Sequence, residues 1–148
     1  MFEQMPVNIL LGLNLGSITA FLFFLANFIV IFTLIHKLIN PLKEWKWLDN
    51  LKNRWHYIHY FGNLGVVILT VVHAVLIREF AHPLHWVLTA LLIWMVIGGL
   101  IMRFSKVSIK TKLKIKRYHA KWYMFVVVFI LLITAHLLSL PNFPYEIG

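Results

Sequence analysis

The chain has 148 residues, of which 61% are hydrophobic and 13% are charged, and its formal net charge is +9. A soluble domain is about half apolar and about a quarter charged, and a chain this short buries too little surface to hide so many apolar side chains from water. The composition therefore argues against a soluble globular, disordered or coiled-coil protein and indicates an integral membrane protein. The absence of cysteine excludes disulfide frameworks, thiolate metal sites and haem attached through paired cysteines.

Four apolar stretches are long enough to cross about 30 Å of hydrocarbon at about 1.5 Å per helical residue. They cover about residues 7–35, 57–77, 84–102 and 122–140. We therefore predict an all-α integral membrane protein, a four-transmembrane-helix bundle that forms a single membrane domain over residues 1–148.

The basic residues are distributed unevenly around these stretches. Thirteen of the fourteen lie in the first or the third connection. Because positively charged loops stay on the cytoplasmic side of a membrane, we expect both termini outside and both basic loops cytoplasmic, in a multi-pass protein of a prokaryotic cytoplasmic (inner) membrane. The charge then needs no nucleic acid as a partner. The alternating segment Lys106–Arg117 is expected to lie on anionic headgroups of the lipid bilayer, with docking of an acidic partner as the alternative.

The first stretch contains small and polar residues that are typical of helix contacts in membranes. Gly12 and Gly16 are expected to allow close helix packing. Asn14 and Asn27 are expected to form hydrogen bonds between helices, with polar contacts to a quinone as the alternative. His36 ends this stretch and is expected at the interface, with replacement of His119 as a ligand as the alternative.

Histidines mark the second stretch. Ionisable groups inside a membrane span are costly, so each one is a hypothesis for a functional site. His73 lies well inside the stretch, whereas His56 and His59 lie near its cytoplasmic end. The fourteen residues from His59 to His73 equal two heptads, which places both side chains on one helix face to within about 40°.

The outer connection and the third stretch give weaker signals. His82 and His85 flank Pro83 in the outer connection and are expected to be exposed to solvent, with use by a quinone headgroup or a proton as the alternative. Gly98 and Gly99 are expected to serve close helix packing.

The fourth stretch carries His136 well inside it and His119 near its cytoplasmic end. Because the second and fourth stretches run in the same direction, the helical rise pairs His73 with His136 and His59 with His119 by depth. A haem between two helices needs one imidazole on each face of its iron, and neutral imidazole is a strong axial ligand. We therefore predict haem b at one or both levels, an outer one on His73 and His136 and an inner one on His59 and His119. On one ideal helix the seventeen residues from His119 to His136 correspond to about 100°, so the angles favour the outer pair.

An internal repeat bears on the inner pair. Residues 54–73 align without a gap with residues 117–136 and match at an Arg–aromatic–His triplet and at the final histidine. In this alignment His56 is the counterpart of His119. We favour His59 as the ligand because it lies deeper in the span, and we keep His56 as the alternative.

Four further residues are expected to serve an inner haem. Arg54 and Arg117 would neutralise its propionates at the cytoplasmic surface, unless they act only as determinants of topology. Gly62 and Gly65 follow His59 by one and two helical turns and would leave room for a flat macrocycle. Close packing between helices is the alternative for both glycines.

Two segments resemble the haem-bearing helices of small di-haem cytochromes b: RWHYIHYFGNLGVVILTVVHAVLI and RYHAKWYMFVVVFILLITAHLL. The wider resemblance is to the ferric-reductase-like transmembrane family and its prokaryotic four-helix relatives, and it covers about residues 54–140. That family carries two histidines, about thirteen or fourteen residues apart, on each of two parallel helices. The resemblance implies His59 and His73 as haem ligands, whereas the spacing of His119 and His136 departs from the family pattern.

These observations predict transmembrane electron transfer by a b-type cytochrome. It would act as a subunit or shuttle linked to a quinone or a redox protein subunit, within a larger complex or a homo-oligomer, and would have no catalytic residue of its own. One alternative is a haem-free membrane anchor subunit whose histidines are satisfied by hydrogen bonds. A histidine-dependent metal or proton transporter is disfavoured, because the four stretches contain no carboxylate.

Overall fold

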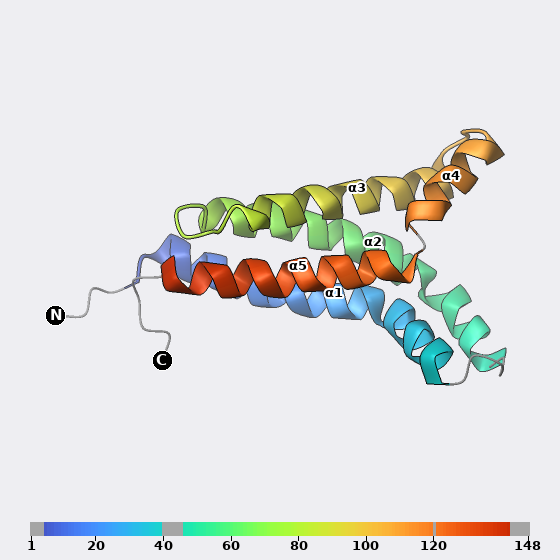
Figure 1. Ribbon diagram of the computed structural model, residues 1–148, viewed down its shortest axis with the longest axis horizontal. Helices are drawn as coiled ribbons and strands as arrows, with labels where there is room; N and C mark the ends of the chain where they lie inside the picture. The colour runs from blue at the N-terminus through green and yellow to red at the C-terminus, as the bar shows by residue number, and fades with distance from the viewer. Residues whose placement is uncertain (1–4, 40–45, 120, 143–148) are drawn as a thin grey trace.

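The computed structural model describes residues 5–39, 46–119 and 121–142. Four long helices form an elongated bundle, and a shorter helix, the fourth along the chain, lies at one end of it (Figure 1). The elements in chain order are α1 (Val7–Ile39), α2 (Lys46–Leu76), α3 (Leu84–Phe104), α4 (Ile109–His119), α5 (Trp122–Ser139) and the short 3₁₀ helix η1 (Leu140–Asn142).

The prediction of four spanning helices is confirmed. Helices α1, α2 and α3, and a fourth segment from Tyr123 to Asn142, are each long and apolar enough to cross a membrane. Their apolar side chains are largely exposed, and Val7 and Phe21 keep 80% and 70% of their accessible surface. Such a surface suits a lipid solvent, because hydrocarbon does not penalise apolar contact as water does.

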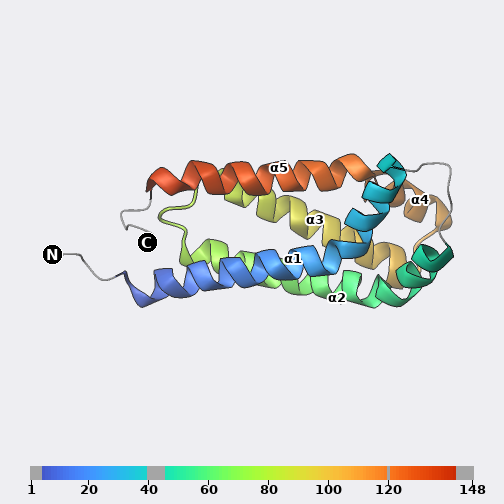
Figure 2. The same cartoon turned by 90° about the horizontal axis from the view of Figure 1, so that it is seen from below.

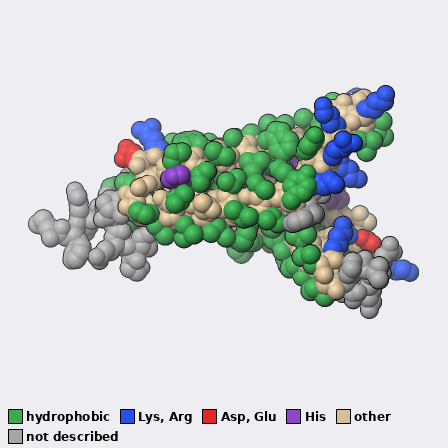
Figure 3. Space-filling view, viewed as in Figure 1, with side chains coloured by type: hydrophobic (Ala, Val, Ile, Leu, Met, Phe, Trp, Pro, Cys, Tyr) green, Lys and Arg blue, Asp and Glu red, His purple; other side chains and the backbone are tan. Residues whose placement is uncertain are grey.

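Neighbouring helices pack in the order α1–α2–α3–α5, and α4 packs on α3. The start of α1, the end of α5 and the connection from α2 to α3 share one end of the bundle, and α4 lies at the other end (Figures 1 and 2). Most Lys and Arg side chains on the face in Figure 3 gather at the α4 end. The chain therefore separates a basic end from an end with few basic residues.

Two helices differ from the expected boundaries. Helix α2 begins at Lys46, eleven residues before the expected span, because its first turns pack on the end of α1. There Leu48 is only 2% exposed, and Trp47 makes an edge-to-face contact with Phe32. Helix α4 folds within the basic segment that was expected to lie on the membrane surface. The hydroxyl of Ser108 accepts a hydrogen bond from the backbone N–H of Thr111 and so caps the start of α4.

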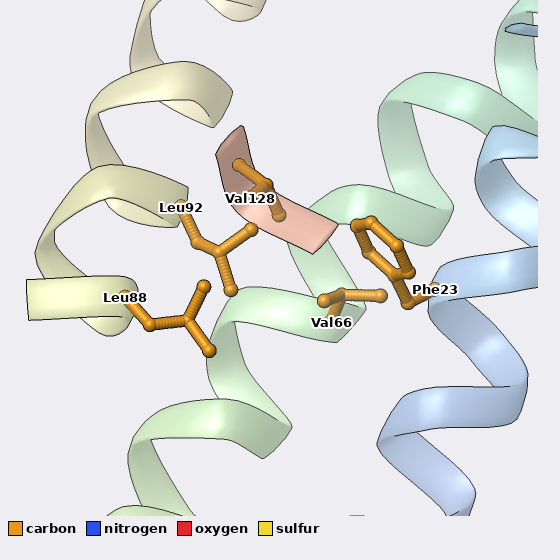
Figure 4. Close-up of a cluster of buried hydrophobic side chains, with 5 residues drawn as sticks. All are labelled: Phe23, Val66, Leu88, Leu92 and Val128. Atoms are coloured by element: carbon orange, nitrogen blue, oxygen red, sulfur yellow. The ribbon is translucent and has the colours of Figure 1, made fainter. Parts of the chain in front are cut away.

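A layer of apolar side chains fills the middle of the bundle. Phe23 of α1, Val66 of α2, Leu88 and Leu92 of α3, and Val128 of α5 form one buried cluster (Figure 4). Val66 is only 1% exposed and lies seven residues from both His59 and His73 along α2. We call this cluster the apolar layer, and it lies between the two levels of histidines.

Glycines bring α1 and α2 into close contact. A Cβ atom built on Gly62 would lie 2.8 Å from Cβ of Ala26, and one built on Gly65 would lie 3.2 Å from Cδ2 of Leu22. Gly62 and Gly65 were expected to leave room for a macrocycle. The structure shows instead that both glycines make room for α1.

Two asparagines join the same helices, as expected for Asn27. Its Nδ2 donates to Oδ1 of Asn63 at 2.9 Å, and Nδ2 of Asn63 donates back to Oδ1 of Asn27 at 3.4 Å. The remaining amide hydrogens go to the carbonyls of Phe23 and His59. The pair is therefore fully satisfied inside the bundle.

Candidate functional site: two levels of histidines

At the inner level, His59 of α2 and His119 at the end of α4 come together. Their ring centroids are 6.5 Å apart, and the rings are nearly perpendicular, with an interplanar angle of 78°. The predicted juxtaposition of these two histidines is confirmed. The angle between His119 and His136 was estimated for one continuous helix. In the structure α4 ends at His119, and Lys121 has an extended backbone before α5 begins. His119 and His136 thus lie on different helices.

Hydrogen bonds orient the His59 ring. Its Nδ1 lies 3.2 Å from the carbonyl oxygen of Ala26. The nearby Asn63 amide already directs its hydrogens to two oxygens, so Nδ1 of His59 carries the hydrogen and donates it to Ala26. This bond leaves the lone pair on Nε2, which is the arrangement of a metal-ligating histidine.

His119 also presents an unpartnered nitrogen. Its Nδ1 is buried and has no hydrogen-bond partner. Burial lowers the pKa of His119, and positive charge on His59 would lower it further. Neutral imidazole, the form that binds metals, is therefore favoured at this position.

A large cavity of about 1160 Å³ opens beside the inner pair. It is lined by His59 and His119, by apolar residues such as Val67, Leu100 and Phe125, and by five basic residues. The basic residues are Lys37, Lys52, Arg103, Lys116 and Lys121. Its lining residues come from α1, α2, α3, α4 and α5. At the α4 end of the bundle, the end of α1 and the start of α2 diverge from α3 and α4 (Figure 1).

Gly99 makes the approach of His119 to α3 feasible. A Cβ atom built on Gly99 would lie 3.3 Å from Cε1 of His119 and 3.6 Å from its Nε2. Gly98 lies next to it and faces Ile115 of α4. Gly98 and Gly99 were expected to serve close helix packing, and both lie against residues of α4.

Three predicted residues of the inner site lie elsewhere. The described residues that line the cavity include neither His56 nor Arg54 nor Arg117. Nδ1 of His56 contacts the carbonyl of Asn53. The two arginines are exposed, and the five basic residues named above take the place expected for them. His59 is thus the partner of His119, although the repeat points to His56.

At the outer level, His73 of α2 and His136 of α5 also come together as predicted. Their ring centroids are 6.1 Å apart, and the rings are nearly parallel, with an interplanar angle of 9°. The expectation for His85 was wrong, because His85 is 4% exposed and its ring centroid lies 4.7 Å from that of His136 and 6.2 Å from that of His73. It stands in the first turn of α3, at the depth of His73, because only a short connection joins α2 to α3.

The two remaining histidines lie outside both groups. His36 is 9% exposed and so is buried in the last turn of α1. His82 precedes α3, where its Nδ1 accepts a hydrogen bond from the backbone N–H of Leu84. The structure brings neither residue into the inner cavity or the outer cluster.

The two levels differ in the space that they offer. The outer cavity, lined by His73, His85 and His136, measures about 80 Å³. Cofactor pockets commonly measure about 300–1,000 Å³. The inner level therefore has the donors and the space for a macrocycle, whereas the outer level has the donors without the space.

Comparison with known protein families, characterised proteins and solved structures found no match for this chain. The resemblance to di-haem cytochromes b therefore rests on the histidines and their spacing. Any assignment of function depends on the geometry of the two levels.

Proposed function

We propose that the protein is a membrane electron-transfer protein of the b-type cytochrome class, with one haem b held between His59 and His119. The observation that supports this proposal is the pair of imidazoles, from two different helices, at the edge of a cavity of about 1160 Å³. A bis-histidine haem needs one neutral imidazole for each axial position.

The surroundings of the inner pair match the two chemical characters of haem. The macrocycle is apolar, and Val67, Leu100 and Phe125 give the cavity apolar walls. The propionates are anionic, and Arg103 and Lys116 belong to the five cations that line the same cavity. Charge-assisted hydrogen bonds to such groups are strong.

The residues of the chain would position the cofactor and limit its contact with water. Bound haem supplies a one-electron carrier. The Ala26 carbonyl holds the His59 ring, Gly99 leaves the space into which His119 fits, and the apolar layer closes the cavity on the side of the outer level.

The proposal also includes an orientation in the membrane and a redox partner. By the positive-inside rule, we place the basic end and α4 on the cytoplasmic side of a prokaryotic inner membrane, with both termini outside. Electrons would enter or leave through a quinone or a redox protein subunit. A larger complex or a homo-oligomer would bring such a partner to the cavity.

Absorption spectra of the purified protein test this proposal. Protein from haem-replete cells should show a Soret band, sharp b-type bands after reduction with dithionite, and one haem per chain. His59→Ala and His119→Ala should each remove these bands. His56→Ala is the matched control and should retain them.

Two results would contradict the proposal. A colourless but folded protein would favour the haem-free anchor subunit. Loss of haem in His56→Ala but not in His59→Ala would show that the repeat alignment identifies the ligand better than the cavity does.

A further inference from the structure

We propose that His73, His85 and His136 form a binding site for a divalent transition-metal ion, separate from the inner haem. One ring nitrogen of each histidine lies within 4.8 Å of those of the other two. The three rings come from α2, α3 and α5, so the site joins three helices at the end of the bundle opposite α4.

Hydrogen bonds leave one lone pair on each ring. Nδ1 of His73 lies 2.7 Å from the carbonyl oxygen of Gly12, and Nδ1 of His136 lies 2.7 Å from that of Leu132. Because a carbonyl oxygen only accepts, each Nδ1 carries the hydrogen and each Nε2 keeps its lone pair. Only 7% of His73 is exposed, and its Nε2 is buried without a hydrogen-bond partner.

Ser139 fixes the orientation of His85. Its hydroxyl donates to the carbonyl of Ala135 at 2.8 Å and accepts from the backbone N–H of His82 at 2.9 Å. Nε2 of His85 lies 3.1 Å from the same oxygen and must donate to it, because the hydroxyl hydrogen is already used. The lone pair of His85 is then on Nδ1. Outer hydrogen bonds of this kind orient histidine ligands and raise their basicity.

The space favours an ion over a macrocycle. The cavity at this level measures about 80 Å³. The His85 ring lies beside the rings of His73 and His136, where a haem between those two histidines would need space. Metal–nitrogen bonds of about 2.0–2.1 Å place two ligand nitrogens at most about 4.2 Å apart, so a small inward movement of the exposed His136 ring would complete the site.

The donor set indicates the class of metal. Imidazole suits zinc, copper, iron and nickel, whereas calcium and magnesium require oxygen ligands. Three protein ligands leave a fourth position for water or another ligand, which is the pattern of open zinc sites.

Titration with Co²⁺, a spectroscopic probe for zinc sites, tests this inference on the full chain in detergent after treatment with a chelator. The wild-type protein should bind one Co²⁺ with visible ligand-field bands, and Zn²⁺ should displace it. His85→Ala and His136→Ala should weaken binding at least about tenfold, and Ser139→Ala about 10–100-fold, the range for loss of an outer partner. His56→Ala, at the other end of the bundle, is the control and should bind as the wild type does.

Spectra and unfolding curves of each variant separate loss of the site from loss of the fold. Absence of stoichiometric Co²⁺ binding, or unchanged binding in folded His85→Ala, would overturn the inference. Two haems per chain, one lost in His73→Ala and His136→Ala but kept in His85→Ala, would also overturn it and assign the outer level to haem. Failure of the haem proposal alone would leave Co²⁺ binding unchanged.

Discussion

The imidazole of His73 lies directly against Gly16 of the neighbouring helix. A Cβ atom built on Gly16 would be 2.7 Å from Cε1 of His73 and 3.0 Å from its Nδ1. One turn earlier on α1, the carbonyl of Gly12 accepts the Nδ1 hydrogen bond of the same ring. Helix α1 therefore positions the His73 ring in two ways: Gly16 leaves space for the ring, and the carbonyl oxygen of Gly12 accepts its hydrogen bond.

Gly16→Ala should weaken metal binding at the outer level. A methyl group 2.7 Å from a ring that is 7% exposed forces that ring to shift, and displacement of a ligand by its outer shell commonly costs about 10–100-fold in metal affinity. The Co²⁺ titration measures the loss. Gly65→Ala, on the same α1–α2 interface but facing only Leu22, should bind as the wild type does. Equal affinity in both variants would show that Gly16 does not position His73.

Gly99→Val should reduce haem binding at the inner level. Even one carbon at this position would lie 3.3 Å from Cε1 of His119, so a branched side chain must move the ring out of the cavity. The ratio of haem to protein in the purified variant should fall to less than about half, since overpacking of this kind costs about 1–3 kcal/mol. Gly98→Val should reduce haem binding less, because a Cβ atom there would lie 3.3 Å from Cγ2 of Ile115 and only at ordinary contact distance, 3.7 Å, from Nδ1 of His119. A normal haem content in Gly99→Val would contradict the proposed ligation by His119.

Asn63→Ala should destabilise the bundle by about 0.6 kcal/mol and by at most about 1.7 kcal/mol, the mean and the maximum for hydrogen bonds between transmembrane helices. The substitution leaves Asn27, which is 7% exposed, without its partner on α2. Unfolding in mixed micelles of detergent and dodecyl sulfate measures the change. A double-mutant cycle with Asn27→Ala should show coupling, whereas Ser17→Ala, which removes only an exposed hydrogen bond within α1, should have no measurable effect. Additive losses for the two asparagines would show that their contact does not contribute.

Arg103→Gln should lower the midpoint potential of the inner haem. A cation favours the reduced cofactor, which carries one positive charge less, and a unit charge about 10 Å away at an effective dielectric constant of about 20 contributes on the order of 1–2 kcal/mol. Arg103 lines the cavity, so a redox titration should show a decrease of tens of millivolts. Arg54→Gln, outside the cavity, should leave the potential unchanged. The reverse result would restore the original assignment of Arg54 to the propionates.

The sequence predicted the parts of the structure that depend on depth. Hydrophobic length predicted the four spanning helices, and the helical rise brought His59 to His119 and His73 to His136. Depth along a helix is a local property, because each residue adds about 1.5 Å whatever its neighbours are. The close asparagine contact of Asn27 also followed from the cost of a polar group in an apolar span.

The directions of side chains were harder to predict. Whether Gly62 faces a cofactor or α1 depends on the rotation of α2 against its neighbours, which a single helix does not determine. His85 was misplaced for a similar reason, because its burial depends on where the end of α5 packs. The extended backbone of Lys121, in a segment without proline or glycine, was not predicted, and it places His119 on a different helix from His136.

The apolar layer also has an electrical consequence. Charge that passes between the two levels of histidines must cross Phe23, Val66 and Val128 and travel about 21 Å along α2, or about two thirds of a 30 Å hydrocarbon core. At 100 mV such a transfer would change in free energy by on the order of 1.5 kcal/mol. Exchange between the two ends of this protein would therefore depend on the membrane potential, whereas reactions confined to one level would not.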